Sequence, residues 1–225
     1  MEIIRSDSRG KTKIKWLNSR HSFSFGNYYS SRNGFGTLRV LNDDVIAPSS
    51  GFDTHPHSNM EIITIMLEGE LTHTDSMGHS EKLMPGEIQV MSAGSGIMHS
   101  EYNNSSSQVH LLQIWIQTQD KDIEPRYDQK TFEFKKNSMT EIVSGKTDSV
   151  LYINQDAVLT IAKYDAGNEF SYSLSNRRGA YLFMIKGNIV INNEKLSKND
   201  AVELKESFTA VVKDECEVLI IEVEI

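Results

Sequence analysis

Two stretches of similar sequence decide the fold, "IMLEGELTHTD" at residues 65–75 and "FMIKGNIVINN" at residues 183–193. Each is typical of a strand, a glycine turn and a second strand, and the alignment pairs Gly69 with Gly187. Because the same succession of elements recurs in one chain, the pattern indicates a duplicated unit.

Two more pairs follow in the same order. "KLMPGEIQV" at 82–90 resembles "KLSKNDAVEL" at 195–204, and "VHLLQIWIQ" at 109–117 resembles "CEVLIIEVEI" at 216–225. The simplest interpretation is two similar β-barrels in tandem.

The rest of the chain favours the same class. Short runs rich in β-branched and aromatic residues alternate with Gly, Asn, Asp and Pro, and long segments with a helical apolar period are hard to find. The predicted fold class is therefore all-β. A polar segment with Pro125 follows the first repeat, so we expect an N-terminal barrel over residues 1–125 and a C-terminal barrel over residues 126–225.

Charge and composition exclude several classes of function. The chain carries 31 acidic against 23 basic residues, with no basic block for nucleic acid or a membrane surface. It has no secretory signal and no apolar run near the roughly 20 residues that span a bilayer. A single cysteine, Cys216, sits in an alternating apolar stretch and is expected to be a buried structural thiol. We expect a cytoplasmic protein.

The histidines carry the strongest chemical signal. All seven lie between His21 and His110, so an imidazole metal site must belong to the first repeat. His55 and His57 are two residues apart, and in an extended segment such residues point the same way, roughly 6 to 7 Å apart. Pro56 between them suits a sheet edge.

A second pair has the same spacing, His99 and Glu101, after the glycine-rich turn "AGSG". On neighbouring strands of a small barrel the two pairs would converge as three imidazoles and one carboxylate, a set that suits a divalent first-row metal. An H-x-H pattern alone is weak and also fits loop histidines. Glu61 is a competing carboxylate that could bind the metal or hydrogen-bond a ligand histidine.

The remaining histidines receive more ordinary interpretations. His73 and His79 flank "TDSMG", which is typical of a hairpin loop, so both are expected to be exposed to solvent. For His110, pocket lining and simple packing are equally plausible, and His21 is expected to be structural.

Several motifs together resemble the pirin family of the cupin superfamily. They are "WLNSRHSFSFGNYY", the long run from "FGTLRVLNDD" to "HTDSMG", "PGEIQVMSAGSGIMHSEYN", and "QIWI" followed by "PRY", and they cover most of residues 10–127. The first cupin motif matches at Gly51, His55, His57, Glu61 and Gly69. The second motif matches loosely, because the expected P-x-G turn is replaced by Pro85 directly followed by Gly86.

The resemblance implies a bicupin whose N-terminal barrel binds a metal and whose C-terminal barrel does not. It implies the ligands His55, His57, His99 and Glu101. The metal would be one divalent ion, most often Fe(II), with Ni, Mn, Cu, Co or Zn as alternatives.

Several pirins are similar in activity to quercetin 2,3-dioxygenases, which cleave flavonols with O₂ and release carbon monoxide. The resemblance thus implies an aromatic flavonol-like substrate and O₂ as partners. Glu101 would be the catalytic base that accepts the proton of the 3-hydroxyl group. The alternative hypotheses are a non-catalytic iron-binding regulator that acts through a protein partner, and a cupin that only stores metal.

Overall fold

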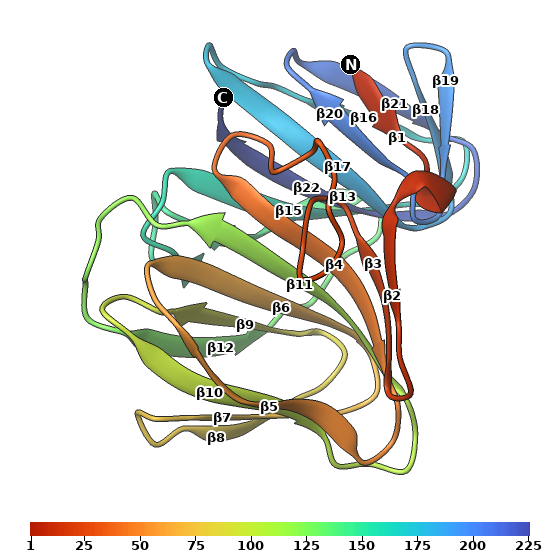
Figure 1. Ribbon diagram of the computed structural model, residues 1–225. Coiled ribbons are helices and arrows are strands. Elements are labelled where there is room, and N and C mark those ends of the chain that lie inside the picture. The colour runs from red at the N-terminus through yellow and green to blue at the C-terminus, as the bar shows by residue number, and fades with distance from the viewer.

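Alternating sequence patterns give 22 strands and one three-residue 3-10 helix, Ser6–Ser8, in the computed structural model, which describes residues 1–225. The strands form two lobes stacked on each other (Figure 1). The Ser6–Ser8 turn is the only helix, so no helical segment could span a membrane. The predicted all-β class with two tandem barrels is confirmed.

The first lobe is made of eleven strands: β2 (Gly10–Lys13), β3 (Leu17–His21), β4 (Leu38–Ile46), β5 (Ser50–His57), β6 (Met60–Glu68), β7 (Leu71–Asp75), β8 (Ser80–Leu83), β9 (Glu87–Ser92), β10 (Ile97–Asn103), β11 (Val109–Gln117) and β12 (Arg126–Thr131). Seven of them form one sheet in the order β12-β9-β6-β11-β4-β3-β2. The other four form a smaller sheet in the order β5-β10-β7-β8.

The second lobe also has eleven strands: β1 (Glu2–Ile4), β13 (Ser138–Ser144), β14 (Leu151–Tyr152), β15 (Ala157–Tyr164), β16 (Glu169–Tyr172), β17 (Arg178–Lys186), β18 (Asn188–Ile191), β19 (Glu194–Ser197), β20 (Ala201–Leu204), β21 (Phe208–Val212) and β22 (Cys216–Glu224). Its sheets run β1-β20-β17-β22-β15-β13-β14 and β16-β21-β18-β19. The central strands of the two lobes therefore share one arrangement, with β6 equivalent to β17, β11 to β22, and β10 to β21.

The aligned glycines occupy equivalent turns. Gly69 joins β6 to β7 with φ +82°, and Gly187 joins β17 to β18 with φ +80°. A Cβ atom at Gly69 would lie 2.7 Å from the carbonyl oxygen of Gln108, and one at Gly187 would lie 2.1 Å from that of Glu215. Both the positive φ and the close backbone approach require glycine, which explains why this part of the repeat is visible in the sequence.

The lobes exchange short strands at their edges. β1 pairs with β20, so the start of the chain completes the sheet of the second lobe. β12 pairs with β9 and extends the sheet of the first lobe. The predicted division after residue 125 stays a prediction. Because β12 pairs with the first lobe and ends at Thr131, the strand pairing alone favours a division after residue 131.

A shared apolar layer holds the lobes together. The two seven-stranded sheets face each other, and one cluster of 26 buried residues contains side chains from both, such as Ile63 and Ile114 from the first and Phe183 and Ile221 from the second. Since successive residues of a strand point to opposite faces, the neighbours of these residues point into their own barrel.

The two barrel interiors differ in polarity. In the second lobe the interior holds a 16-residue apolar cluster that includes Phe170, Phe208 and Ala210 of the smaller sheet, and Cys216, which is buried as predicted. The equivalent sheet of the first lobe carries the histidine pairs. The second barrel is thus filled with hydrocarbon at the level where the first presents imidazoles.

The shared layer predicts that damage in the second lobe is felt in the first. Ile221→Ala should lower the free energy of unfolding by about 2 to 5 kcal/mol, because it removes buried methylenes and leaves a cavity. Both tryptophans, Trp16 and Trp115, lie in the first lobe, so their fluorescence during urea unfolding reports on that lobe.

We expect the tryptophan-detected midpoint to shift to lower urea in Ile221→Ala. Ile225→Ala is the control, since Ile225 is 43% exposed and should change stability by no more than about 0.5 kcal/mol. An unchanged tryptophan midpoint in Ile221→Ala would mean that the lobes unfold independently.

Candidate metal centre

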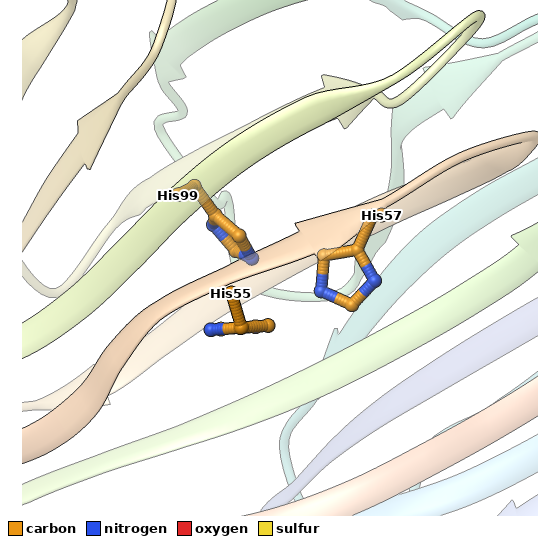
Figure 2. Close-up of side chains that lie close together, drawn as sticks. All are labelled: His55, His57 and His99. Atoms are coloured by element: carbon orange, nitrogen blue, oxygen red, sulfur yellow. The ribbon is translucent and has the colours of Figure 1, made fainter.

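Three histidines meet on the inner face of the smaller sheet of the first lobe. His55 and His57 lie on β5, which is an edge strand, as Pro56 indicated, and His99 lies on β10 directly opposite His55. Figure 2 shows the three rings turned toward a common point. The ring centroids are 4.5 Å apart for His55 and His99, 4.8 Å for His55 and His57, and 4.9 Å for His57 and His99. One ring nitrogen from each residue lies within 4.8 Å of the other two.

The hydrogen-bonding state of these rings fits a metal ion. Nδ1 of His55 donates to the carbonyl oxygen of Asp53 at 2.7 Å, which leaves a lone pair on Nε2. Nε2 of His57 and both ring nitrogens of His99 are buried without a hydrogen-bond partner. Buried polar atoms are rarely left unsatisfied unless an ion or water completes them, so the three imidazoles have the geometry of a ligand set.

Burial keeps two of the rings neutral. Burial and the neighbouring rings of His99 and His55 lower the pKa of His57 to about 4. Burial, His55 and His73 lower the pKa of His99 to about 3. A ligand imidazole must be neutral, so the lowered pKa values keep these nitrogens available for a metal at neutral pH.

Glu101 lies one step deeper in the barrel. It follows His99 on β10 and is 1% exposed. Gln113 Nε2 donates to its Oε2 at 2.6 Å, while Thr64 Oγ1 and Gln89 Nε2 donate to its Oε1 at 3.1 and 3.5 Å. A carboxylate offers about four acceptor positions, so Glu101 keeps acceptor capacity beyond these three bonds.

The four predicted ligands do not form one equally close set. Glu101 forms a second group within 4.8 Å together with His99 and His73, whereas His55 and His57 group with His99 alone. Glu101 nevertheless lines the same cavity as His55 and His57. Its assignment as a fourth ligand stays a prediction.

Glu61, the competing carboxylate, lies on the face of β6 that points away from the barrel interior and toward the second lobe. It pairs across the sheet with Ile116 of the shared apolar layer and with Ser92, whose hydroxyl donates to it at 2.6 Å. Burial raises the pKa of Glu61, which Ser92, Asn154 and Arg126 partly offset. Its side chain therefore belongs to the junction between the lobes and is separated from the histidines by its own strand.

The expectation that His73 is exposed is wrong. The ring is fully buried on β7, stacks on Tyr127 at 4.6 Å, and bonds through Nε2 to Asp75 at 3.2 Å. His79 is partly exposed and bonds to the same carboxylate at 2.9 Å. The alternation of "LTHTD" contained the missed signal, because an inward Leu71 sends His73 and Asp75 inward as well.

The other two histidines lie outside the cluster. His21 is buried and bonded to Asn42 at 2.8 Å, in agreement with a structural role. His110 bonds to Asp43 at 2.6 Å and lines a cavity between the lobes.

An aromatic cavity of about 390 Å³ opens onto the cluster. Its walls are Trp16, Phe25, Phe52 and Trp115, and its floor includes His55, His57, Glu101 and Gln113. Trp115 lies edge-on to His57 at 4.8 Å, and its Nε1 donates to Gln113 at 3.2 Å. One hydrogen-bond chain thus runs from the cavity wall through Gln113 to Glu101.

Sequence reasoning found only part of this cavity. The strand "HLLQIWI", which holds His110, supplies Gln113 and Trp115 to the lining. The strand "EIITIML" supplies none of the lining residues. Trp16, Phe25 and Phe52 come from loops and strand ends in the sequence, whose convergence no periodicity indicates.

Another carboxyl is buried behind the site. Asp44 is 1% exposed, and burial together with the negative charges of Asp43 and Glu101 raises its pKa to about 7, against the effect of Ser19. The barrel interior therefore holds Asp44 and Glu101 in addition to Asp75, and Asp44 is partly protonated at neutral pH.

Comparison with known families and proteins gives a consistent result. Residues 4–116 match the Pirin family model, and residues 141–223 match the model of the quercetinase C-terminal cupin domain. The chain is 41% identical over 204 residues to the quercetin 2,3-dioxygenase of Escherichia coli strain K12, covering 90% of this chain and 88% of that protein. It is 36% identical to a pirin-like protein of Caulobacter vibrioides over 96% of both.

The fold has solved counterparts. The crystal structure of the bacterial pirin YhhW from Escherichia coli in complex with nickel(II) superposes with a TM-score of 0.95 at 38% identity, covering 99% of this chain and 98% of that one.

Metal binding should separate the histidines from Glu61. His55→Ala, His57→Ala and His99→Ala should each weaken Ni(II) binding more than about 100-fold in isothermal titration calorimetry, because each removes a predicted ligand. Glu61→Gln is the matched control and should bind Ni(II) like the unchanged protein. A loss of metal in Glu61→Gln comparable to that in His99→Ala would contradict the ligand assignment.

The lowered histidine pKa values predict an acid sensitivity of the metal-free protein. Between pH 6.5 and about 4 the unfolded chain binds protons that His57 and His99 in the folded state do not, so stability falls as pH falls through this window. His99→Asn should flatten that fall in chemical unfolding measured with a chelator present.

Asp44 should change stability with pH in the opposite direction to His57 and His99. Its pKa is raised, so it favours the folded state below about pH 4 and loses that contribution as pH rises toward 7. Asp44→Asn should therefore gain stability over the unchanged protein as pH rises. If the free energy of unfolding of His99→Asn and of Asp44→Asn followed pH in parallel with that of the unchanged protein, these groups would not titrate as described.

Proposed function

The chain belongs to the pirin family, and on this basis we propose that it is a metal-dependent dioxygenase that cleaves flavonols such as quercetin with O₂. The observation that carries the proposal is the aromatic cavity lined by two of the three clustered histidines, His55 and His57, and by the carboxylate of Glu101. A flavonol is flat, aromatic and hydroxylated, so it matches walls of Trp and Phe side chains and a polar floor.

The proposed metal ligands are His55, His57, His99 and Glu101, and the proposed ion is Fe(II), with nickel supported by the relative in complex with nickel(II). Three neutral imidazoles and one carboxylate suit several first-row divalent ions. When bound, such an ion would supply a net positive charge that favours the anionic form of the flavonol 3-hydroxyl group, together with redox chemistry toward O₂.

Glu101 is the proposed general base. Its carboxylate would accept the proton of the 3-hydroxyl group at about 2.6 to 3.2 Å. The two carboxylate oxygens of Glu101 accept hydrogen bonds from Gln113, Thr64 and Gln89. These bonds orient the carboxylate before the substrate binds. The hydrogen bond between Trp115 and Gln113 links the position of this base to the wall that would stack on the substrate.

The aromatic walls would position the substrate and exclude water. Trp16 and Phe52 pack edge to face at 5.0 Å, and Phe25 and Trp115 do the same at 5.4 Å. Both pairs line the cavity, so a planar ring system entering it would replace water over the histidines.

The direct test is anaerobic reconstitution with Fe(II), followed by quercetin and a measured amount of O₂. We expect O₂ uptake and carbon monoxide release in equal amounts, with loss of the quercetin absorbance. Ni(II)-loaded protein should be assayed in parallel, because a relative is known in complex with nickel(II).

Variants assign the roles. His57→Ala should abolish turnover together with metal binding, whereas Glu101→Gln should lower kcat by about 100-fold or more while the three histidines still hold metal, since a positioned base contributes roughly that factor. Glu61→Gln is the control. No turnover with any first-row metal, alongside recovery of a stable protein partner, would favour the regulatory hypothesis instead.

A further inference from the structure

A second cavity, of about 340 Å³, lies between the lobes at the other end of β6. The first lobe contributes the end of β6, the turn before β9 and the start of β11, and the second contributes β15, β17 and β22. It shares no lining residue with the aromatic cavity above the histidines. It is therefore a separate site, in the position between two packed units where ligand pockets often occur.

Its floor is apolar. Ile65 and Ile88 from the first lobe and Ile161 and Ile185 from the second belong to the shared apolar layer and also line the cavity. Phe134 packs against the same layer and is only partly buried. Apolar side chains that border an open cavity favour a ligand with a hydrocarbon body.

Its rim carries three lysines with different partners. Lys163 forms an ion pair with Glu217 at 3.2 Å, and Lys186 forms one with Glu215 at 3.1 Å. Lys198, in the turn between β19 and β20, forms no ion pair. The positive charge of Lys198 is thus the one that the cavity leaves without a carboxylate partner.

The acidic residues that line the cavity do not form an ion pair with Lys198. Glu217 is taken by Lys163, and Glu87 accepts a hydrogen bond from the backbone of Met84 at 2.7 Å. Glu68 is exposed, so water screens it. His110, opposite Glu68, is bonded to Asp43, whose pKa is lowered, against burial, by His110, Arg9 and Lys198.

From this arrangement we infer that the cavity between the lobes binds a small amphipathic carboxylate. Its hydrocarbon chain would lie on the isoleucine floor, and its carboxylate would lie beside Lys198. Because the ligand would contact both seven-stranded sheets at once, its binding would stabilise the packing of the lobes. The inference is independent of the flavonol chemistry.

The test is isothermal titration calorimetry of the Ni(II)-loaded protein with decanoate, octanoate and hexanoate. Affinity should fall roughly tenfold for each two carbons removed, since each buried methylene contributes to transfer from water. Decanol, which lacks the charge, should bind at least about tenfold more weakly than decanoate.

Variants locate the binding site. Lys198→Glu should weaken decanoate binding at least about tenfold, and Leu67→Trp should block it by filling the cavity beside the floor. Lys13→Glu is the matched charge control, because Lys13 is an exposed lysine on β2, outside this cavity. Trp115→Ala, in the other cavity, should leave decanoate binding unchanged.

Two outcomes would overturn the inference. In one, decanoate binds as tightly to Lys198→Glu and to Leu67→Trp as to the unchanged protein. In the other, Trp115→Ala alone weakens binding, which would place the carboxylate in the aromatic cavity. Circular dichroism melting curves for every variant identify any that fail to fold, and Leu67→Trp decides the question if Lys198→Glu is one of them.

Discussion

The strands at the centre of both large sheets are buried on both faces. Successive residues of such a strand point alternately into the layer between the lobes and into the barrel, and the rest of the structure depends on this alternation. On β6 and β11 every second residue enters the apolar layer between the lobes, and the residues between them enter the barrel. The outer positions are mostly apolar because they face another sheet, and the exceptions on β6 and β11 are Glu61 and His110. The inner positions of the first lobe are free to be polar, and they hold Thr64, Gln89 and Gln113 around Glu101. The same rule sends Glu61 and Glu101 to different compartments although both are buried acids.

Much of this organisation was predictable, because the repeat and the pairs His55/His57 and His99/Glu101 are short-range patterns. The exclusion of Glu61 was not predictable, since it depends on which face of β6 meets the second lobe. His73 was misjudged because the hairpin residues "TDSMG" outweighed the alternation that places its ring inside. The aromatic walls are formed by residues 16, 25, 52 and 115, which only the closed barrel brings together. The edge strand β12 is polar and β1 is only three residues long, so nothing in their sequences indicates the lobe that they join.

The two lobes show how one architecture supports two interiors. In the first lobe, imidazoles and carboxyls fill the smaller sheet and are compatible with a cation. In the second, Phe170, Phe208 and Ala210 fill the equivalent sheet with hydrocarbon. A packed apolar barrel contributes stability without further partners, whereas a barrel with unsatisfied ring nitrogens at His57 and His99 depends on something else to complete it. The second barrel and the shared layer thus bury apolar surface that the polar interior of the first barrel does not.

The exchange of β1 and β12 has a consequence for how such a molecule can arise and be taken apart. β1, from the start of the chain, covers the outer edge of the second lobe's sheet, and β12, which follows the predicted division after residue 125, covers the outer edge of the first lobe's sheet. A half cut free at the linker would expose a row of unpaired backbone groups, which is a template for aggregation. Although the halves share one repeated pattern, neither can be moved alone into another protein. Any engineered chain that separates them must also include the edge strand that the other half supplies.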